Sequence, residues 1–385
     1  MQGTQLVSRG GGPVLLLSMR RMSQLVAYCS DYEFEDVIAE STGADRIDVF
    51  DHDALEWSRR IYRYTRHISG ARGGAGPFAG WHTTVPLERD YDLFFPVFNQ
   101  PFELFALAAV PDWRRRCRRA ACFISEVWLN QFPQYLIELL APFDHIFLGV
   151  IHPVEEVARL VKRPCDYLPL AADVPMFAPV PRAPPRSIAV CNIGRRSQVT
   201  HDALLQLARD PDFFYYYDTV AASGIDMKQR TFRVQNAREH RLLLSNLMRR
   251  SRFCFAHRGF VNDPKFTQGR DEISSRVYEG AAAGVVMLGE PPRGPDYERQ
   301  FDWPDVVVPT PFDCPNIGEV LLRLEADPER IAGIRRANVH HSALRHDWVY
   351  RLRTVFETLG LAPTPGMLER ERRLQLLAAA ALAQL

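Results

Sequence analysis

Residues 269–290 have the sequence GRDEISSRVYEGAAAGVVMLGE, and this stretch decides the fold class. Its polar start predicts a loop, and Ser274–Ala283 has the periodicity of a helix. Gly284 permits a tight turn, after which the apolar run Val285–Gly289 predicts a buried strand. A helix joined directly to a short apolar strand is typical of sheets that carry helices on their faces. The stretch therefore predicts an α/β fold.

The same alternation extends through the rest of the chain, which favours two similar α/β units in tandem. Further strands are expected at Val14–Ser18, Arg46–Phe50, Tyr91–Phe98, Ala121–Trp128, His145–Val150, Asp166–Ala171, Ser187–Ile193, Phe213–Asp218, Phe253–His257 and Asp305–Val308. Further helices are expected at Ser23–Glu40, Ala54–His67, Phe102–Ala109, Pro133–Leu140, Pro153–Val161, Thr200–Arg209 and Arg238–Arg250, with three more reaching about Leu359.

A proline-rich stretch separates the two predicted units. Prolines at five positions between 175 and 185 argue against a helix or a central strand and favour a semi-rigid linker. We therefore expect an N-terminal domain at 1–173, a linker at 174–186, a C-terminal domain at 187–360 and a helical tail at 361–385. A chain of 385 residues has room for two such domains.

The charge and the cysteine content of the chain indicate which partners and which cellular compartment to expect. The formal net charge is +1, which gives no reason to expect a nucleic-acid partner, so an anionic ligand would need local arginines. The seven cysteines have no metal-ligand spacing, which favours reduced thiols and a cytoplasmic protein. No apolar run approaches the roughly 20 residues of a membrane span, so we expect at most peripheral membrane contact.

Several motifs are absent or weak. The sequence has no P-loop, zinc-protease or serine-hydrolase motif. The glycine-rich stretch 69–76 follows no predicted strand, and a surface loop explains it better than a dinucleotide site, although such loops can close over substrates. The basic run Arg114–Arg119 is interpreted as a solvated helix end, with binding of an anionic surface as the alternative.

One face of the predicted helix carries the side chains that could bind a ligand. If the helix begins near Glu272, then Glu272, Ser275, Arg276 and Glu279 share a face, because residues three and four apart are neighbours. Carboxylates accept hydrogen bonds from sugar hydroxyls, guanidinium groups hold diphosphates, and a helix N-terminus adds donors. The small residues Ala281–Gly284 should let the helix lie close to the sheet. The alternative is a surface helix with an ordinary salt bridge between Arg276 and Glu279.

Ser275–Gly284 resembles the R-x-x-E-x-x-A-x-G signature of GT-B glycosyltransferases, most closely the group with a sporulation-protein-like C-terminal domain. Other stretches that resemble this group are 167–173, 327–330, 334–338 and 346–351. The resemblance implies two Rossmann-like domains facing a central cleft, with the acceptor on the first and the nucleotide sugar on the second.

Within this resemblance, Glu279 takes the place of the second acid of an E-x7-E motif, which binds the donor ribose. Asp271 stands at the position of the first acid and is one methylene shorter than glutamate, while Glu272 is one residue out of register. Either could contact the donor sugar.

Other candidate donor contacts follow predicted strands, because ligands of α/β folds bind at the carboxyl ends of strands. They are Gly194, Arg195 and Arg196, for which an ordinary turn is the alternative; Lys265 and Arg270; and Arg20 and Arg21. His257 could stack near the base, but we favour its role as a strand end.

The chemical step would need positive charge at the leaving group and, for an inverting enzyme, a general base. Candidate bases are Glu126, His152 and, more weakly, His82, and each is also explained by a structural role. No metal or cofactor is expected. The predicted reaction transfers a sugar from a UDP- or GDP-type donor to a glycan, lipid or small-molecule acceptor. The alternatives are a nucleotide-sugar epimerase and an inactive scaffold of the same fold.

Overall fold

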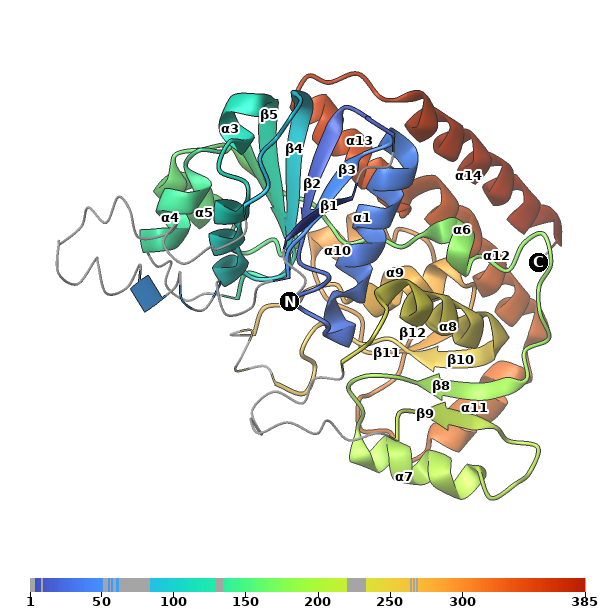
Figure 1. Cartoon of the computed structure of the whole chain (residues 1–385). Helices are drawn as coiled ribbons and strands as arrows, with labels where there is room; N and C mark the ends of the chain where they lie inside the picture. Colours follow the sequence, from blue (N-terminus) through green and yellow to red (C-terminus); the bar gives the residue numbers. More distant parts are fainter. Residues whose placement is uncertain are drawn as a thin grey trace. The chain divides into compact units, whose positions relative to one another are not determined.

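The structure is a computed structural model that describes residues 4–7, 10–50, 55, 57, 60, 61, 84–128, 134–219, 233–263, 265, 267 and 269–384. These residues form two compact units, which we describe separately (Figure 1). Unit 1 comprises Met1–Pro169, Arg233–Ala237 and Arg351–Leu368, and unit 2 comprises Leu170–Phe232, Arg238–Tyr350 and Glu369–Leu385. Both units contain a parallel sheet with helices, so the α/β prediction is confirmed.

Unit 1 is built on a seven-stranded sheet with the order β1-β3-β2-β4-β5-β6-β7. Its strands are β1 (Gln5–Val7), β2 (Val14–Ser18), β3 (Asp45–Asp48), β4 (Tyr91–Phe98), β5 (Cys117–Ile124), β6 (His145–Leu148) and β7 (Cys165–Tyr167). Only β1 runs antiparallel to its neighbour. The carboxyl ends of the other six strands therefore meet at one edge.

Both faces of this sheet are covered, which explains why its central strands β2 and β4 are largely apolar. Phe95 of β4 lies edge-on to Phe34 of α1 (Cys29–Thr42), with ring centroids 6.0 Å apart. The next residue back along the strand, Phe94, points to the opposite face and stacks on Trp113 at 5.0 Å. Side chains of successive strand residues alternate between faces, so this pair places packed aromatic layers on both sides.

The remaining helices of unit 1 connect or flank these strands. They are the 3₁₀ helices η1 (Val26–Tyr28) and η3 (Pro101–Ala109), α3 (Trp113–Arg116), α4 (Gln134–Leu140) and α5 (Val154–Val161). The basic run 114–119 is not a single helix end as predicted, because α3 stops at Arg116 and β5 begins at Cys117. The glycine-rich stretch 69–76 and most of the helix expected at 54–67 lie outside the described residues.

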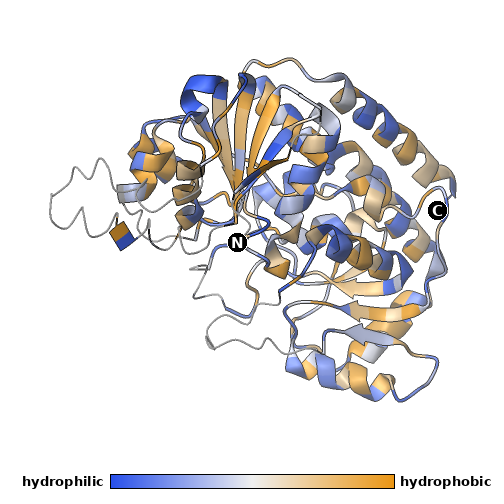
Figure 2. Cartoon of the chain, in the orientation of Figure 1, coloured by the Kyte–Doolittle hydropathy of each residue, from blue (hydrophilic) through white to orange (hydrophobic). Residues whose placement is uncertain are grey.

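Unit 2 contains a five-stranded parallel sheet with the order β12-β11-β10-β8-β9. The strands are β8 (Ile188–Asn192), β9 (Tyr215–Tyr217), β10 (Ser251–Phe255), β11 (Val286–Gly289) and β12 (Val307–Pro309). In Figure 2 the central strands are coloured as hydrophobic, in agreement with their full burial.

Helices of unit 2 pack on both faces of its sheet. They are α6 (Val174–Phe177), α7 (Gln198–Leu207), α8 (Ala237–Arg250), α9 (Ser275–Ala282), α10 (Pro295–Gln300), α11 (Ile317–Glu325) and α12 (Pro328–Arg345). Two further helices, α13 (Trp348–Thr358) and α14 (Pro365–Gln384), have residues in both units. One apolar layer joins strand residues such as Phe253 to Leu204 of α7 and Ile317 of α11.

On the other face, α9 lies very close to the sheet, as its small residues predicted. A Cβ atom at Gly280 would overlap the thioether of Met287 on β11. Gly284 ends the helix with φ of +57°, a conformation that favours glycine. The observed packing depends on these two glycines.

The proline-rich stretch contains a helix, although its prolines were predicted to exclude one. Pro175 lies in the first turn of α6, where the missing N–H leaves no helical hydrogen bond unmade. Val174 and Phe177 of this helix are fully buried. The prediction that this stretch cannot form helix is therefore wrong.

None of the helices within the described residues combines the length and the apolar composition needed to cross a bilayer.

Candidate functional site

The carboxyl edge of the unit 2 sheet gathers loops that follow four of its strands. The loop after β11 is linked to the loop after β12, because the Phe312 N–H donates to Glu290 Oε1 at 2.8 Å. It is also linked to the loop after β10, because the Arg258 N–H donates to the Glu290 carbonyl at 2.8 Å. Thr200 of α7 donates to the Phe312 carbonyl at 2.7 Å, which adds the β8–α7 connection. We call this set of connected loops the carboxyl-edge platform.

His257 follows β10 near the centre of the platform. Its Nδ1 accepts the Glu290 N–H at 3.1 Å, and its ring stacks on Phe255 with centroids 5.8 Å apart. Burial lowers the pKa of His257 to about 4, so the ring is neutral at pH 7. Because Nδ1 is the acceptor, the proton is on Nε2, which has no hydrogen-bond partner within the described residues. The ring therefore presents a fixed donor at the edge where ligands bind α/β sheets.

The two candidates for the first acid lie in different environments. Asp271 is a partly exposed loop residue whose carboxylate accepts from Arg258 Nη1 at 3.1 Å and from the Arg293 N–H at 3.1 Å. Glu272 is buried at 6% exposure, and its carbonyl accepts the Gly259 N–H. Asp271 therefore forms an ion pair with Arg258, a cationic side chain of the platform.

Helix α9 agrees within one residue with the predicted range Ser274–Ala283, but it does not begin near Glu272, as the shared helical face required. It starts at Ser275 with Ser274 as N-cap, whereas 271–273 form a non-helical connection. Glu272 therefore does not share a helical face with Ser275, Arg276 and Glu279, and that prediction is wrong. Ser274 explains the start, because its hydroxyl donates to the His257 carbonyl at 2.6 Å and ties the helix to the strand end.

Gly194, Arg195 and Arg196 lie in the turn between β8 and α7, as predicted. Gly194 has a φ of +95°, so glycine is required there, and its N–H donates to Asp218 at 3.2 Å. Arg195 lies over the Phe260 ring at 3.7 Å and donates to Asn262, which joins this turn to the loop after β10. Arg196 lies over Tyr217 at 5.2 Å. Both guanidinium groups therefore lie on the platform.

Lys265 and Arg270 are exposed residues of the loop between β10 and α9. Arg270 makes a backbone hydrogen bond to the Thr267 carbonyl at 3.1 Å. Arg270 directly precedes Asp271 in the chain, so it adds an exposed positive charge to this loop.

Glu279 is buried at the centre of an ion cluster between two helices. Its Oε1 accepts a hydrogen bond from Arg241 of α8, and its Oε2 lies 2.9 Å from Nη1 of Arg276. Only 2% of the Glu279 side chain and 4% of the Arg241 side chain are exposed, against 21% for Arg276. Burial opposes ionisation, but the charges of Arg241 and Arg276 lower the pKa of Glu279 below its usual value. The carboxylate is therefore ionised at neutral pH.

The cluster retains one unused acceptor. Although Oε2 of Glu279 is close to Arg276, neither atom has hydrogen-bond geometry with any group in the described residues. Arg276 is the member of the cluster that solvent reaches, and the neighbouring Ser275 hydroxyl has no partner in the described part of the chain. Both interpretations of this face, a ligand site and a structural salt bridge, are compatible with this arrangement.

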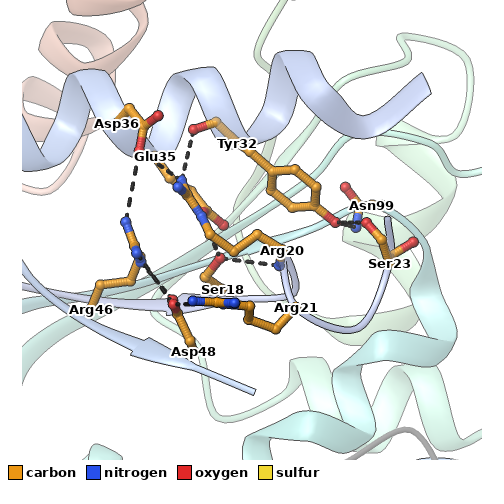
Figure 3. A network of polar contacts seen from close by, with 10 residues as sticks. All are labelled: Ser18, Arg20, Arg21, Ser23, Tyr32, Glu35, Asp36, Arg46, Asp48 and Asn99. Atoms are coloured by element: carbon orange, nitrogen blue, oxygen red, sulfur yellow. Dashed lines mark hydrogen bonds and ion pairs between the residues drawn. The ribbon is translucent and has the colours of Figure 1, made fainter. Parts of the chain in front are cut away.

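Arg20 and Arg21 follow β2 in unit 1, but they have different surroundings (Figure 3). The Arg20 guanidinium is held by Glu35 at 2.8 Å, Asp36 at 2.9 Å and the Tyr32 carbonyl at 2.9 Å. Arg21 is 55% exposed and lies 3.9 Å from Asp48. Arg21 is therefore the one available for a ligand, while Arg20 fixes α1 to the end of β2.

The candidate bases Glu126 and His152 follow β5 and β6, two neighbouring strands of the unit 1 sheet. The ring of His152 lies 5.4 Å from that of Trp128, so the ends of these two strands are in contact. The Glu126 N–H donates to the Asn99 carbonyl at 3.1 Å, which places Glu126 beside the end of β4. His82 lies outside the described residues.

Two arginines of the site were not among the residues predicted from the sequence. Arg258 comes directly after His257 and satisfies the same rule that selected residues at strand ends. Arg241 lies 38 residues before Glu279 in the chain, and no local pattern connects the two.

Comparison with known proteins agrees with this architecture. The family described as glycosyl transferase-like matches residues 203–357, which include β9 to β12 and most of α13. No curated protein sequence matches the chain.

Two solved structures resemble the chain along almost all of its length. HepE from Anabaena in complex with UDP and glucose has 11% identity and a TM-score of 0.51, and the match covers 91% of this chain and 99% of that one. A glycosyltransferase from Rickettsia africae has 10% identity and a TM-score of 0.49, covering 90% and 97%. The likeness to HepE shows that the chain has the GT-B type of α/β fold, and residues 203–357 match the glycosyl transferase-like family.

Proposed function

We propose that the chain transfers a sugar from a nucleoside diphosphate sugar to a hydroxyl group of an acceptor, and that the donor binds on the carboxyl-edge platform. The observation that carries the proposal is the convergence of Arg195, Arg196 and the Nε2–H of His257 at one edge of the unit 2 sheet. A diphosphate is a dianion with many acceptor oxygens, and guanidinium and imidazole N–H groups match it.

The same groups would act on the leaving group. Breaking the bond between the sugar and the diphosphate leaves negative charge on the diphosphate oxygens, and fixed donors stabilise that charge as it develops. Arg195 is held by Phe260 and Asn262, and His257 by Glu290, so both would be oriented before the donor binds. The N-terminus of α7, capped by Ser197, would add positive potential to the same place.

For the sugar and the ribose we propose Asp271 and the α9 face. Asp271 has two carboxylate oxygens that accept one hydrogen bond each in the described structure, so each retains capacity for a hydroxyl. The unused Oε2 of Glu279 is the second acceptor, reached when Arg276 moves. Because the HepE structure contains UDP and glucose, UDP-glucose is the first donor to test.

The acceptor hydroxyl would bind to unit 1 near the ends of β5 and β6, where Glu126 and His152 are the candidate bases. A glycan, a lipid-linked sugar or a small molecule would each supply the hydroxyl. No metal or cofactor has a part in this proposal.

The test is donor hydrolysis and transfer measured by released nucleoside diphosphate, with UDP- and GDP-sugars. We expect Arg195→Gln and His257→Phe to reduce the rate at least tenfold, whereas Arg209→Gln, an exposed arginine beyond α7, should leave it unchanged. Wild-type rates in both platform variants would contradict the proposed site. Isomerised donor without an acceptor would favour an epimerase, and an absence of both binding and turnover would favour an inactive scaffold.

A further inference from the structure

A cationic depression lies in unit 1, at the opposite edge of its sheet from the candidate bases. Its volume is about 600 Å³, which is within the range of pockets that hold small molecules. It is lined by Gly11, Gly12, Pro13, Arg89, Asp90, Tyr91, Asp92, Arg115, Arg116, Cys117 and Arg118. These residues lie at the amino ends of β2, β4 and β5, beside α3 (Figure 1). We call this depression the amino-edge groove.

The base of the groove is fixed by Arg89. Its guanidinium donates to Asp45 at 2.7 Å and to the carbonyls of Gly11 and Gly12 at 2.8 Å. It also lies over the Tyr91 ring at 4.2 Å. With these partners Arg89 ties the loop before β2 to the start of β4, so it shapes the groove and is not free to bind a ligand.

Three other arginines are held only weakly. The exposed fraction of the side chain is 81% for Arg115, 44% for Arg116 and 64% for Arg118. Each of them is paired with one aspartate at the surface. These partners lie at 2.5, 3.0 and 3.9 Å, respectively. A guanidinium has five N–H donors, and exposed ion pairs contribute little to stability. Most of the donors are therefore available, and a bound anion could replace the aspartates at little cost.

The groove also contains acceptors. Asp90 and Asp92 are 77% and 54% exposed, and both line the groove, Asp90 beside Arg116 and Asp92 beside Arg118. Carboxylates in this position repel an extended negatively charged surface, such as a membrane or a nucleic acid. They accept hydrogen bonds from hydroxyl groups, however. In Figure 2 the short helix α3 at this edge is coloured as hydrophilic beside the apolar strands, as expected for a hydrated binding surface.

We propose that the amino-edge groove binds a small phosphorylated polyol, such as a sugar phosphate. Arg116 and Arg118 hold the phosphate through charge-assisted hydrogen bonds, with Arg115 as an additional donor. Asp90 and Asp92 accept hydrogen bonds from the hydroxyl groups. The site is independent of the proposed transfer reaction, because it lies in unit 1 and uses none of the residues assigned to the donor, the leaving group or the acceptor.

The test is isothermal titration calorimetry of the full chain with glucose 6-phosphate, repeated with glucose, with inorganic phosphate and in the presence of saturating UDP. We expect saturable one-to-one binding that UDP does not displace, with glucose alone at least tenfold weaker. The double variant R116Q/R118Q should weaken binding at least tenfold. The control R159Q/R209Q removes the same charge from exposed positions outside the groove and should bind like the wild type.

The thermal unfolding of the two double variants is compared as well, so that a loss of binding is not mistaken for a loss of stability. We expect equal melting temperatures, since all four side chains are exposed or make only surface pairs. Equal affinity of R116Q/R118Q and the control would overturn the proposal, as would complete displacement by UDP. Binding to vesicles with 30% phosphatidylserine, without binding of glucose 6-phosphate, would also overturn it and identify a lipid surface instead.

Discussion

Replacing Glu279 by alanine should destabilise unit 2 strongly. The variant leaves the Arg241 guanidinium without its carboxylate, although only 4% of that side chain is exposed. Removing one partner of a buried ion pair costs about 3–5 kcal/mol, because the buried charge that remains loses its counter-charge. A domain of this size is stable by about 5–15 kcal/mol, so the loss is a large fraction of the total. Arg276 adds little to the cost, since its side chain is 21% exposed and can turn toward water.

The assay is urea unfolding followed by far-UV circular dichroism. We expect a lower midpoint for Glu279→Ala with an unchanged slope, and a loss below about 1 kcal/mol for Arg276→Gln. The double variant Arg241→Met/Glu279→Leu removes both charges and should recover most of the stability, because apolar pairs of similar volume replace buried ion pairs well.

A loss of less than about 1 kcal/mol in Glu279→Ala would refute this reasoning, as would a double variant no more stable than the single one. The same measurement is needed to interpret a loss of sugar transfer in Glu279→Ala. An unfolded variant would be inactive whether or not Glu279 contacts the donor. Glu279→Gln keeps the shape and one acceptor oxygen. Measured below its melting temperature, it separates a donor contact from a purely structural role.

Three further outcomes follow from the structure. Gly284→Ala should lower the free energy of unfolding by about 2 kcal/mol or more in urea, because its Cβ would lie 2.7 Å from Val339 and its φ is left-handed. The control Gly333→Ala adds a Cβ to open space in a helix and should be neutral or stabilising. Burial raises the pKa of Glu103 from 4.5 to about 7, so its contribution to stability is complete below pH 4.5 and is lost as the pH rises to about 7. Unfolding at pH 5 and pH 7.5 should therefore show a smaller difference in Glu103→Gln than in the wild type, and an equal difference would argue against a protonated Glu103. Because burial lowers the pKa of His257 to about 4, its ring should show no protonation between pH 5.5 and 8 by NMR titration, and a midpoint near 6.5 would contradict a buried ring that stays neutral.

The fold could be predicted because its strands are buried on both faces. Continuous apolar runs such as 93–98 and 285–289 identify strands without any knowledge of their partners. The small residues of α9 likewise predicted its close approach to the sheet. These features depend on local sequence, and the structure places them within a few residues of the predicted bounds.

The features that were missed depend on contacts between distant residues. The shared helical face required α9 to begin near Glu272, but the Glu272 carbonyl accepts the Gly259 N–H and that segment is not helical. Arg241 reaches Glu279 from another helix, and the resemblance named only the acid. Pro175 was taken to exclude a helix, although a first-turn position makes proline compatible with one.

The candidate site could be predicted where a topological rule applied. Ligands bind at the carboxyl ends of parallel strands, so Gly194, Arg195 and Arg196 were selected from the sequence and lie on the platform. The tautomer of His257 could not be predicted, because it depends on the backbone N–H of Glu290 from another strand end.

The measurement that tests the central proposal most directly is calorimetric or thermal-shift titration of the wild type and Arg195→Gln with UDP, GDP and their sugars. We predict that at least one nucleotide binds saturably and stabilises the wild type by about 2.7 kcal/mol at 100 times its dissociation constant. The same nucleotide should bind Arg195→Gln at least tenfold more weakly. A flat response of the folded wild type to every nucleotide would contradict the proposed donor site.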